Sequence, residues 1–234
     1  MTTEFDMSMM GELTFFLGLQ IKQIIGGIFI HQEKYAKELV KQFVLECAKL
    51  MGTLMHPNIK LDKDEHARDA DETHYRGMIS SLMYLTSSRL DIIQSVGVCS
   101  RFQSKPKESH LSTFKRIIRN VLGTTNYGLW YPKTDSFQLV GYYDADFDGD
   151  KIDRSTSGMC CFLGKSLNVW SSKKQASMAL STTKAEYIAA SSCCSQLLWL
   201  KTQLPDYKLK VKIKFFWADY DQASLTPCVA LQSR

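Results

Sequence analysis

The chain has 234 residues, 44% of them apolar, and its formal net charge is +5. This length allows one large or two small domains with their own cores, and no apolar stretch is long enough to cross a bilayer. The small basic excess is compatible with a nucleic-acid partner without indicating one. Residues 1–10 hold two acids and no base, which is typical of neither a signal peptide nor a transit segment, so secretion is not expected.

The first elements predicted along the chain are a hairpin and a helix. Residues 15–23 and 26–32 are β-prone runs around Gly26–Gly27, a pattern typical of a hairpin. The apolar stripe within residues 33–43 has helical spacing. Residues 56–73 are polar and acidic, and we expect a solvated connector there rather than a metal site.

The next segment is helical in pattern. Residues 75–102 predict two helices that meet near Ser87–Ser88, and residues 111–122 predict a third helix. One side of that third helix is basic, with Lys115, Arg116 and Arg119. Such a face is usually only solvated, and contact with the phosphates of a nucleic acid is the alternative.

The pattern changes at Phe137. Residues 137–144 alternate as a strand does, and two shorter strands over residues 159–163 and 167–171 are joined through Gly164. Residues 183–204 predict a long helix closed by Pro205, and residues 211–217 predict a fourth strand. Three strands, a helix and a strand predict an α/β layer structure with a mixed sheet.

The seven cysteines are an odd number and form no CxxC pair. Cys160–Cys161 and Cys193–Cys194 are neighbours in sequence, which is a poor spacing for a zinc site. We therefore expect the cysteines to be small apolar core residues in a reducing compartment.

Residues 144–150 (DADFDGD) are the densest group of carboxylates in the chain. The D-x-D-x-D-G pattern opens the calcium loop of an EF-hand, but that loop follows a helix and has Glu at position 12. Here the segment follows a predicted strand, and position 12 counted from Asp144 is Ser155. A polar turn and a metal-binding carboxylate at a strand end both stay open.

The other candidate acids also have simple structural explanations. Thr183 and Glu186 fit the S/T-x-x-E capping box, while Asp219 and Asp221 follow the fourth strand and could be loop residues. However, strand-end acids and an acid in the first turn of a packing helix could meet at one edge of the sheet. Such a cluster repels itself unless divalent cations neutralise it, and it could hold two Mg²⁺ ions.

Several ordered motifs resemble the Pol polyprotein of Ty1/copia-type retrotransposons. Residues 141–146 (GYYDAD), 153–158 (DRSTSG), 170–175 (WSSKKQ) and 180–187 (LSTTKAEY) are similar to the ribonuclease H domain of that family. The upstream motifs resemble the last part of its reverse transcriptase; they are residues 16–21 (FLGLQI), 31–35 (HQEKY), 81–86 (SLMYLT) and 128–132 (GLWYP).

The resemblance implies an architecture of three parts. These are the end of the reverse transcriptase over residues 1–55, with its hairpin and helix, and a linker and helical connection over residues 56–136. The third is a ribonuclease H-like mixed sheet with a flanking helix over residues 137–234, which we expect to be truncated at its C-terminal end. The paired metal-binding aspartates of the reverse transcriptase lie upstream of residue 1 in this family, so we expect no polymerase active site.

The resemblance also implies an activity and its residues. Asp144 matches the first catalytic aspartate and Glu186 the catalytic glutamate, and Asp221 is the nearest match to the third acid, with Asp219 as the alternative. Together they would hold two Mg²⁺ ions, or Mn²⁺, and hydrolyse the RNA strand of an RNA–DNA hybrid. Lys115, Arg116, Arg119, Lys173 and Lys174 are the predicted nucleic-acid contacts.

Departures from the family pattern predict weak or absent activity. The likeness fades after Tyr207, one residue is missing between Arg154 and Ser155, and Lys184 replaces an acid. A non-catalytic nucleic-acid-binding remnant and an inactive translated relic are the alternatives. The family further implies the remainder of the Pol polyprotein as a partner, no membrane, and a cytoplasmic location in the virus-like particle of the element, with the nucleus as a second location.

Overall fold

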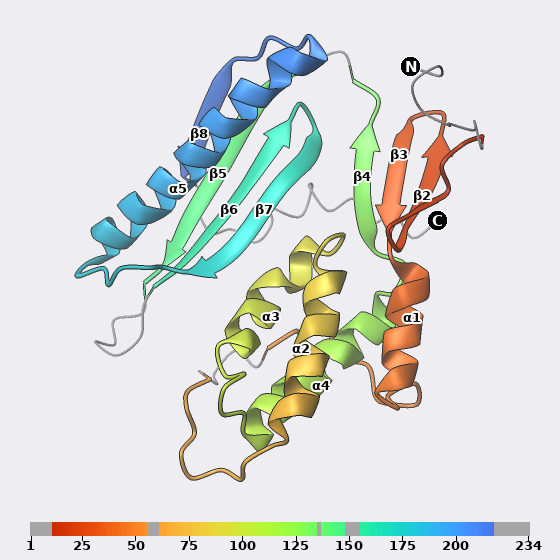
Figure 1. Ribbon diagram of the computed structural model, residues 1–234, viewed down its shortest axis with the longest axis vertical. Helices are drawn as coiled ribbons and strands as arrows, with labels where there is room; N and C mark the ends of the chain where they lie inside the picture. Colours follow the sequence, from red (N-terminus) through yellow and green to blue (C-terminus); the bar gives the residue numbers. More distant parts are fainter. Residues whose placement is uncertain (1–10, 56–60, 135–136, 148–154, 218–234) are drawn as a thin grey trace, which may run out of the picture.

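The computed structural model describes residues 11–55, 61–134, 137–147 and 155–217. Within these ranges the chain forms two four-stranded sheets and five α-helices. Figure 1 shows the two sheets side by side, with four of the helices grouped beneath them and the fifth along one face of the second sheet. The predicted α/β class is therefore confirmed. None of the helices in the described ranges is both long and apolar enough to span a membrane.

The first sheet contains the predicted hairpin. It has the strand order β1-β2-β3-β4 and consists of β1 (Phe15–Phe16), β2 (Leu19–Ile24), β3 (Gly27–His31) and β4 (Gly128–Pro132). Ile24 pairs with Gly27, so the hairpin turn is Ile25–Gly26 rather than Gly26–Gly27. Gly27 also pairs with Pro132, and a Cβ at Gly27 would lie 2.2 Å from the carbonyl oxygen of Tyr131, so only glycine fits there.

The sequence did not predict that β4 is a strand. It pairs with β3 across nearly a hundred residues of chain, and this pairing joins the predicted reverse transcriptase segment to the predicted connection. The pairing partner of a strand depends on tertiary packing, which a short run such as GLWYP does not reveal by itself.

The helical group confirms the predicted pattern of helices. It consists of α1 (Glu33–Gln42), α2 (Glu72–Leu85), the 3₁₀ turn η1 (Leu90–Ile92), α3 (Ile93–Ser100) and α4 (Glu108–Gly123). The helices bury one shared apolar core, in which Leu39, Tyr75, Val96 and Phe114 are all inaccessible or nearly so. The apolar stripes seen in the sequence face inward because burial removes them from water.

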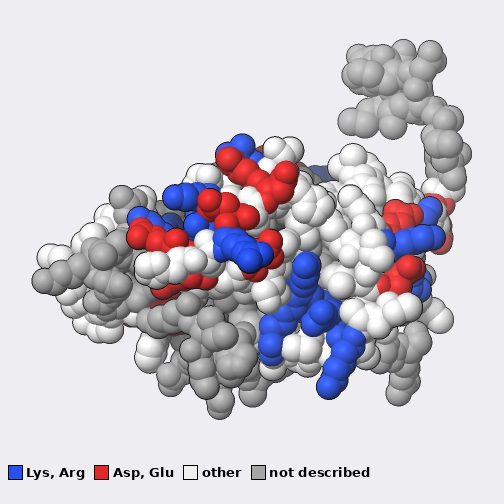
Figure 2. Space-filling view, turned by 90° about the horizontal axis from the view of Figure 1, so that it is seen from below, with Lys and Arg blue, Asp and Glu red and all other residues white. Residues whose placement is uncertain are grey.

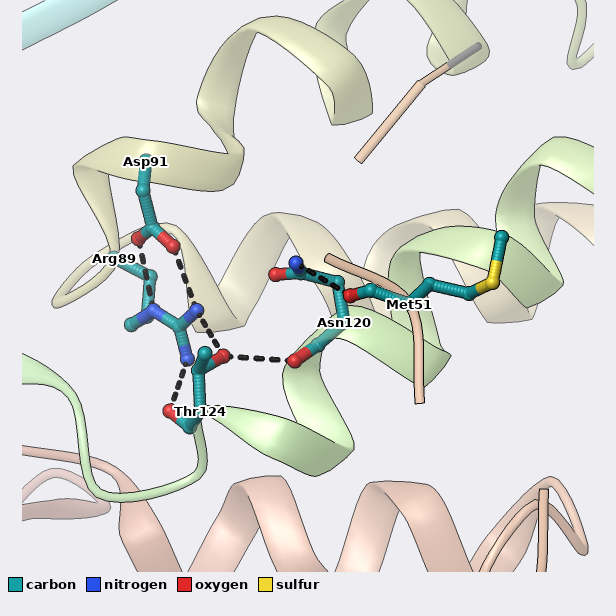
Figure 3. A network of polar contacts seen from close by, with 5 residues as sticks. All are labelled: Met51, Arg89, Asp91, Asn120 and Thr124. Atoms are coloured by element: carbon teal, nitrogen blue, oxygen red, sulfur yellow. Dashed lines mark hydrogen bonds and ion pairs between the residues drawn. The ribbon is translucent and has the colours of Figure 1, made fainter. Parts of the chain in front are cut away.

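A buried arginine ties the ends of these elements together (Figure 3). Arg89, whose side chain is 1% exposed, donates two hydrogen bonds to the carboxylate of Asp91, at 2.8 and 2.6 Å. It also donates to the carbonyl oxygen and the hydroxyl of Thr124, both at 2.8 Å. Thr124 in turn donates to Asn120, whose amide donates to the carbonyl of Met51. The network fixes η1 against the C-terminal end of α4.

The second sheet is mixed, as predicted, with the order β7-β6-β5-β8. Its elements are β5 (Leu139–Asp146), β6 (Thr156–Leu163), β7 (Ser166–Lys174), the helix α5 (Thr182–Gln203) with the 3₁₀ turn η2 (Leu204–Tyr207), and β8 (Ile213–Trp217). The strands β5, β6 and β7 are antiparallel neighbours, and β8 runs parallel to β5. Each face of this sheet is covered by a different part of the chain.

One face of the second sheet packs on α5. Leu139, Cys161, Cys193 and Leu197 form that core, and Gly141 lets the helix approach, since a Cβ there would lie 2.7 Å from Leu197 Cδ1. The opposite face packs on the first sheet, where Leu129 of β4 packs against side chains of β6 and β7. The second sheet is thus held between α5 and the rest of the molecule.

The prediction that the cysteines are core residues is confirmed for four of the six that the structure describes. Cys99, Cys160, Cys161 and Cys193 are buried, whereas Cys194 is half-buried and Cys47 is exposed. Two of the four, Cys161 and Cys193, belong to the core between the second sheet and α5.

Candidate active site at the end of strand β5

Asp144 lies near the end of β5, the strand between β6 and β8. It faces Gly158 across the β5–β6 pair, and its neighbour Tyr143 pairs with Trp217, the last residue of β8. Tyr143 packs in the core under α5, while Tyr142 packs on the opposite face. Strand alternation therefore directs the half-buried side chain of Asp144 away from α5, at the edge where β8 ends.

Glu186 comes from the start of α5, which covers the other face. The helix begins at Thr182, and its cap is Ser181, whose hydroxyl accepts a hydrogen bond from the N–H of Lys184 at 3.3 Å. A capping box would require an acid at the position of Lys184, so the capping explanation for Glu186 is wrong. The sequence misled here because the helix begins at Thr182, one residue earlier than predicted, so that Ser181 caps it and Thr183 lies within it.

The two carboxylates interact electrostatically. The negative charge of Asp144 raises the pKa of Glu186, and the backbone N–H of Ala145 lowers the pKa of both acids. The two acids therefore act at the same end of the sheet, although they start from opposite faces of it. The end of β5 is therefore the place where the strand and the helix bring their acids together.

Burial and repulsion dominate the electrostatics of this pair. Burial raises the pKa of Asp144, and the negative charge of Asp146 raises it further. Burial also raises the pKa of Glu186, followed by the charge of Asp144, while Trp217 and the N–H of Ala145 lower it. One carboxylate oxygen of Glu186, Oε2, is buried and has no hydrogen-bond partner among the residues that the structure describes. An acceptor in this position suits a cation or a donor from a ligand.

Part of the predicted site lies outside the described residues. Asp221 and its alternative Asp219 both do so, as do Asp148 and Asp150 of the acidic run. Among the residues that the structure does describe, no three His, Cys, Asp or Glu side chains are grouped closely enough to hold a metal ion. The acids placed at the site are thus Asp144 and Glu186, with Asp146 two residues further along β5.

Lys173 and Lys174 lie at the same end of the sheet as these acids. Thr156 of β6 pairs with Asp146 on one side and with Lys174 on the other, and Gly158 likewise stands between Asp144 and Ser172. Two strand spacings therefore separate the lysines from the acids, about 10 Å. Both lysines are exposed. A basic pair at this distance is suited to the phosphates that flank a bond held at the carboxylates.

The predicted basic face of α4 is partly used for packing. Arg116 donates to the carbonyl and hydroxyl of Thr53, and it lines a hollow of about 250 Å³ together with Arg119 and Met51. The Nε atom of Arg119 is buried and has no partner in the part of the chain that the structure describes, whereas Lys115 is exposed. Figure 2, which views the helical side of the molecule, shows a group of Lys and Arg side chains set apart from the acidic ones.

Comparison with known proteins identifies the family. The chain is 36% identical over 201 residues to the retrovirus-related Pol polyprotein from transposon RE1 of Arabidopsis thaliana, a match that covers 86% of this chain and 14% of that protein. It is 34% identical over 234 residues to the retrovirus-related Pol polyprotein from transposon TNT 1-94 of Nicotiana tabacum. That match covers 95% of this chain and 18% of that protein. The uncharacterized mitochondrial protein AtMg00810 of Arabidopsis thaliana is 31% identical to this chain, and the match covers 85% of this chain and 83% of that protein.

The chain belongs to the copia-type retrotransposon Pol polyproteins. It spans about a seventh of the RE1 polyprotein and less than a fifth of the TNT 1-94 polyprotein. No family model matches this copia-type chain. No solved structure matches it either.

Two groups at the site of this copia-type chain escaped the sequence reasoning. The backbone N–H of Ala145 is invisible in a sequence, because any residue at that position would supply it. Trp217, whose side chain lowers the pKa of Glu186, ends a strand in which the aromatic residues Phe215 and Phe216 precede it. Nothing in the sequence distinguishes Trp217 from these ordinary strand residues.

Proposed function

We propose that this chain carries a ribonuclease H-like domain, residues 137–234, which hydrolyses the RNA strand of RNA–DNA hybrids. The observation that supports it most is the electrostatic interaction of the two acids at the end of β5, where the charge of Asp144 raises the pKa of Glu186. The membership of the chain in the copia-type Pol polyproteins supports it independently. Two acids held together at a sheet edge, with lysines two strands away, suit a phosphodiester substrate.

The residues at the site fit divalent cations. The charge of Asp144 makes ionisation of Glu186 more costly, and the buried Oε2 of Glu186, which has no partner among the described residues, offers a ligand atom. Asp144 and Glu186 would hold Mg²⁺ or Mn²⁺, with Asp221 as the proposed third ligand and Asp219 as its alternative. When bound, such ions lower the pKa of a coordinated water and stabilise the leaving oxygen of a phosphodiester.

The chain's own residues would bind and orient the hybrid. Asp144 is fixed by a central strand and Glu186 by a capped helix, so their carboxylates are preorganised. Lys173 and Lys174 would contact phosphates near the site, and Lys115, Arg116 and Arg119 phosphates further away. Discrimination of RNA from DNA would depend on contacts to the 2′-hydroxyl.

We further propose that the activity of this copy is weak. Lys184 places a positive charge in the first turn of α5, where the resemblance to the family implies an acid. The rest of the Pol polyprotein as partner, and a location in the virus-like particle, are proposals on the same family basis.

The test combines cleavage with metal binding. We expect slow cleavage of a labelled RNA–DNA hybrid in Mg²⁺ or Mn²⁺, and calorimetric binding of either ion. Asp144→Asn should abolish both, while Asp206→Asn, an exposed acid of η2 in the same domain, should change neither. Metal binding that is equal in the wild type and Asp144→Asn would contradict the nuclease proposal.

A second function is supported by the exposed lysines alone. A non-catalytic remnant would bind hybrids through Lys115, Lys173 and Lys174 and would be indifferent to Asp144→Asn. Its binding would weaken steeply with salt, because each neutralised phosphate releases counterions. A translated relic would show neither salt-dependent binding nor cleavage.

A further inference from the structure

Gln175 is a buried amide directly after β7 and is only 4% exposed. Its Nε2 donates two hydrogen bonds, one to the carbonyl oxygen of Ala185 at 2.9 Å and one to the hydroxyl of Ser157 at 2.9 Å. Its backbone N–H donates to the carbonyl of Ser155 at 2.8 Å. A carbonyl can only accept, so the nitrogen of the amide must face Ala185, and its orientation is fixed.

The two acceptors lie on the two sides of the candidate active site. Ala185 is the residue before Glu186 in α5. Ser157 stands opposite Ala145 in the β5–β6 pair, next to Asp144. One amide nitrogen therefore connects the helical turn that carries Glu186 to β6, the strand that pairs with β5 beside Asp144.

The segment that joins β7 to α5 contributes little apolar packing. In residues 176–181, which join these elements, only Ala179 is buried, and Met178 and Leu180 are exposed. Ala179 is therefore the one buried apolar residue that residues 176–181 contribute near the start of α5. In addition, both hydrogen bonds of the Gln175 amide are made by its nitrogen, and its Oε1 is buried with no partner within the described ranges.

We propose that Gln175 is a positioning residue, which sets the distance between the carboxylates of Glu186 and Asp144 by linking α5 to β6. The proposal deepens the nuclease assignment and rests on it for its functional meaning. Removal of the amide leaves both acids in place but frees the first turns of α5 to shift along the sheet. Second-layer residues of this kind typically change metal affinity by about 10–100-fold when they are removed.

The test uses the full chain with Gln175→Met, which keeps the length of the side chain and removes both donors. The matched control is Gln103→Met, because Gln103 also donates through Nε2 to a backbone carbonyl, that of Ser100, but lies at the end of α3. The first readout needs no metal: the titration of the Glu186 carboxyl, followed by ¹³C NMR in EDTA. Its pKa should fall toward that of an ordinary glutamate in Gln175→Met and stay unchanged in Gln103→Met.

The second readout is the affinity for Mn²⁺, measured by calorimetry on protein that is folded by circular dichroism. We expect a loss of about tenfold or more in Gln175→Met and less than twofold in Gln103→Met. Should Gln175→Met fail to fold, Ser157→Ala removes only the strand acceptor and should shift the Glu186 titration in the same direction, by less.

The outcomes separate the two proposals. An unchanged Glu186 titration in Gln175→Met, or in Ser157→Ala where Gln175→Met does not fold, overturns the positioning role whatever the metal does. A changed titration in a protein whose wild type binds no Mn²⁺ supports the positioning role and refutes the nuclease site. A change in both readouts supports both.

Discussion

Gly141→Ala tests whether the close approach of α5 to β5 holds the two acids together. A Cβ at Gly141 would lie 2.7 Å from Cδ1 of Leu197 and 2.8 Å from Sγ of Cys193. These distances fall short of ordinary van der Waals contact, at 3.4 Å, by 0.7 and 0.6 Å. Leu197 and Cys193 are at most 1% exposed, so neither has free space into which to move.

Overpacking of this kind typically costs about 1–3 kcal/mol. The loss of backbone freedom in the unfolded chain offsets about 0.4–1 kcal/mol of that cost. We therefore expect Gly141→Ala to lower the free energy of unfolding by about 1–2 kcal/mol. The added methyl group should also push α5 away from β5 and move Glu186 with it.

The assay is urea unfolding at equilibrium, with Gly77→Ala as the control. Gly77 is exposed within α2, and a Cβ there would meet no atom within 4 Å. Alanine at that position should stabilise the chain by about 0.5–1 kcal/mol, since glycine is the poorer helix former. If Gly141→Ala proves as stable as the wild type, the packing argument for the site is wrong.

Two further predictions concern charged groups. Arg89→Ala should destabilise the chain by about 3 kcal/mol, which is the low end for a broken buried pair because Asp91 is partly exposed. In the same urea assay, Arg76→Ala breaks only an exposed pair with Glu72 and should cost less than about 0.5 kcal/mol. Burial raises the pKa of Asp144 in the folded chain, so its stabilising contribution is present in acid and is lost as the pH rises through that pKa. Asp144→Asn should therefore raise the melting temperature in EDTA at neutral pH, with a gain that disappears below about pH 4; no gain at neutral pH would refute the repulsion described at the site.

The sequence by itself determined the kind and order of most elements. The alternation of residues 137–144 predicted the central strand β5, and the long run before Pro205 predicted α5 to within a residue at each end. These predictions succeeded because the period of apolar residues is a local property that burial of one face imposes on each element. The acids Asp144 and Glu186 were predicted from the ordered motifs that surround both.

Only the tertiary structure decided how these pieces meet. The pairing of β4 with β3, the use of Arg116 to hold Thr53, and the effect of the Asp144 charge on the pKa of Glu186 all join residues that are distant in sequence. Such contacts depend on which faces pack and how closely two backbones approach. Gly141 gives the physical reason. Within the sequence of the strand nothing shows why a glycine is needed there, and the need appears only where Leu197 and Cys193 of α5 lie against it.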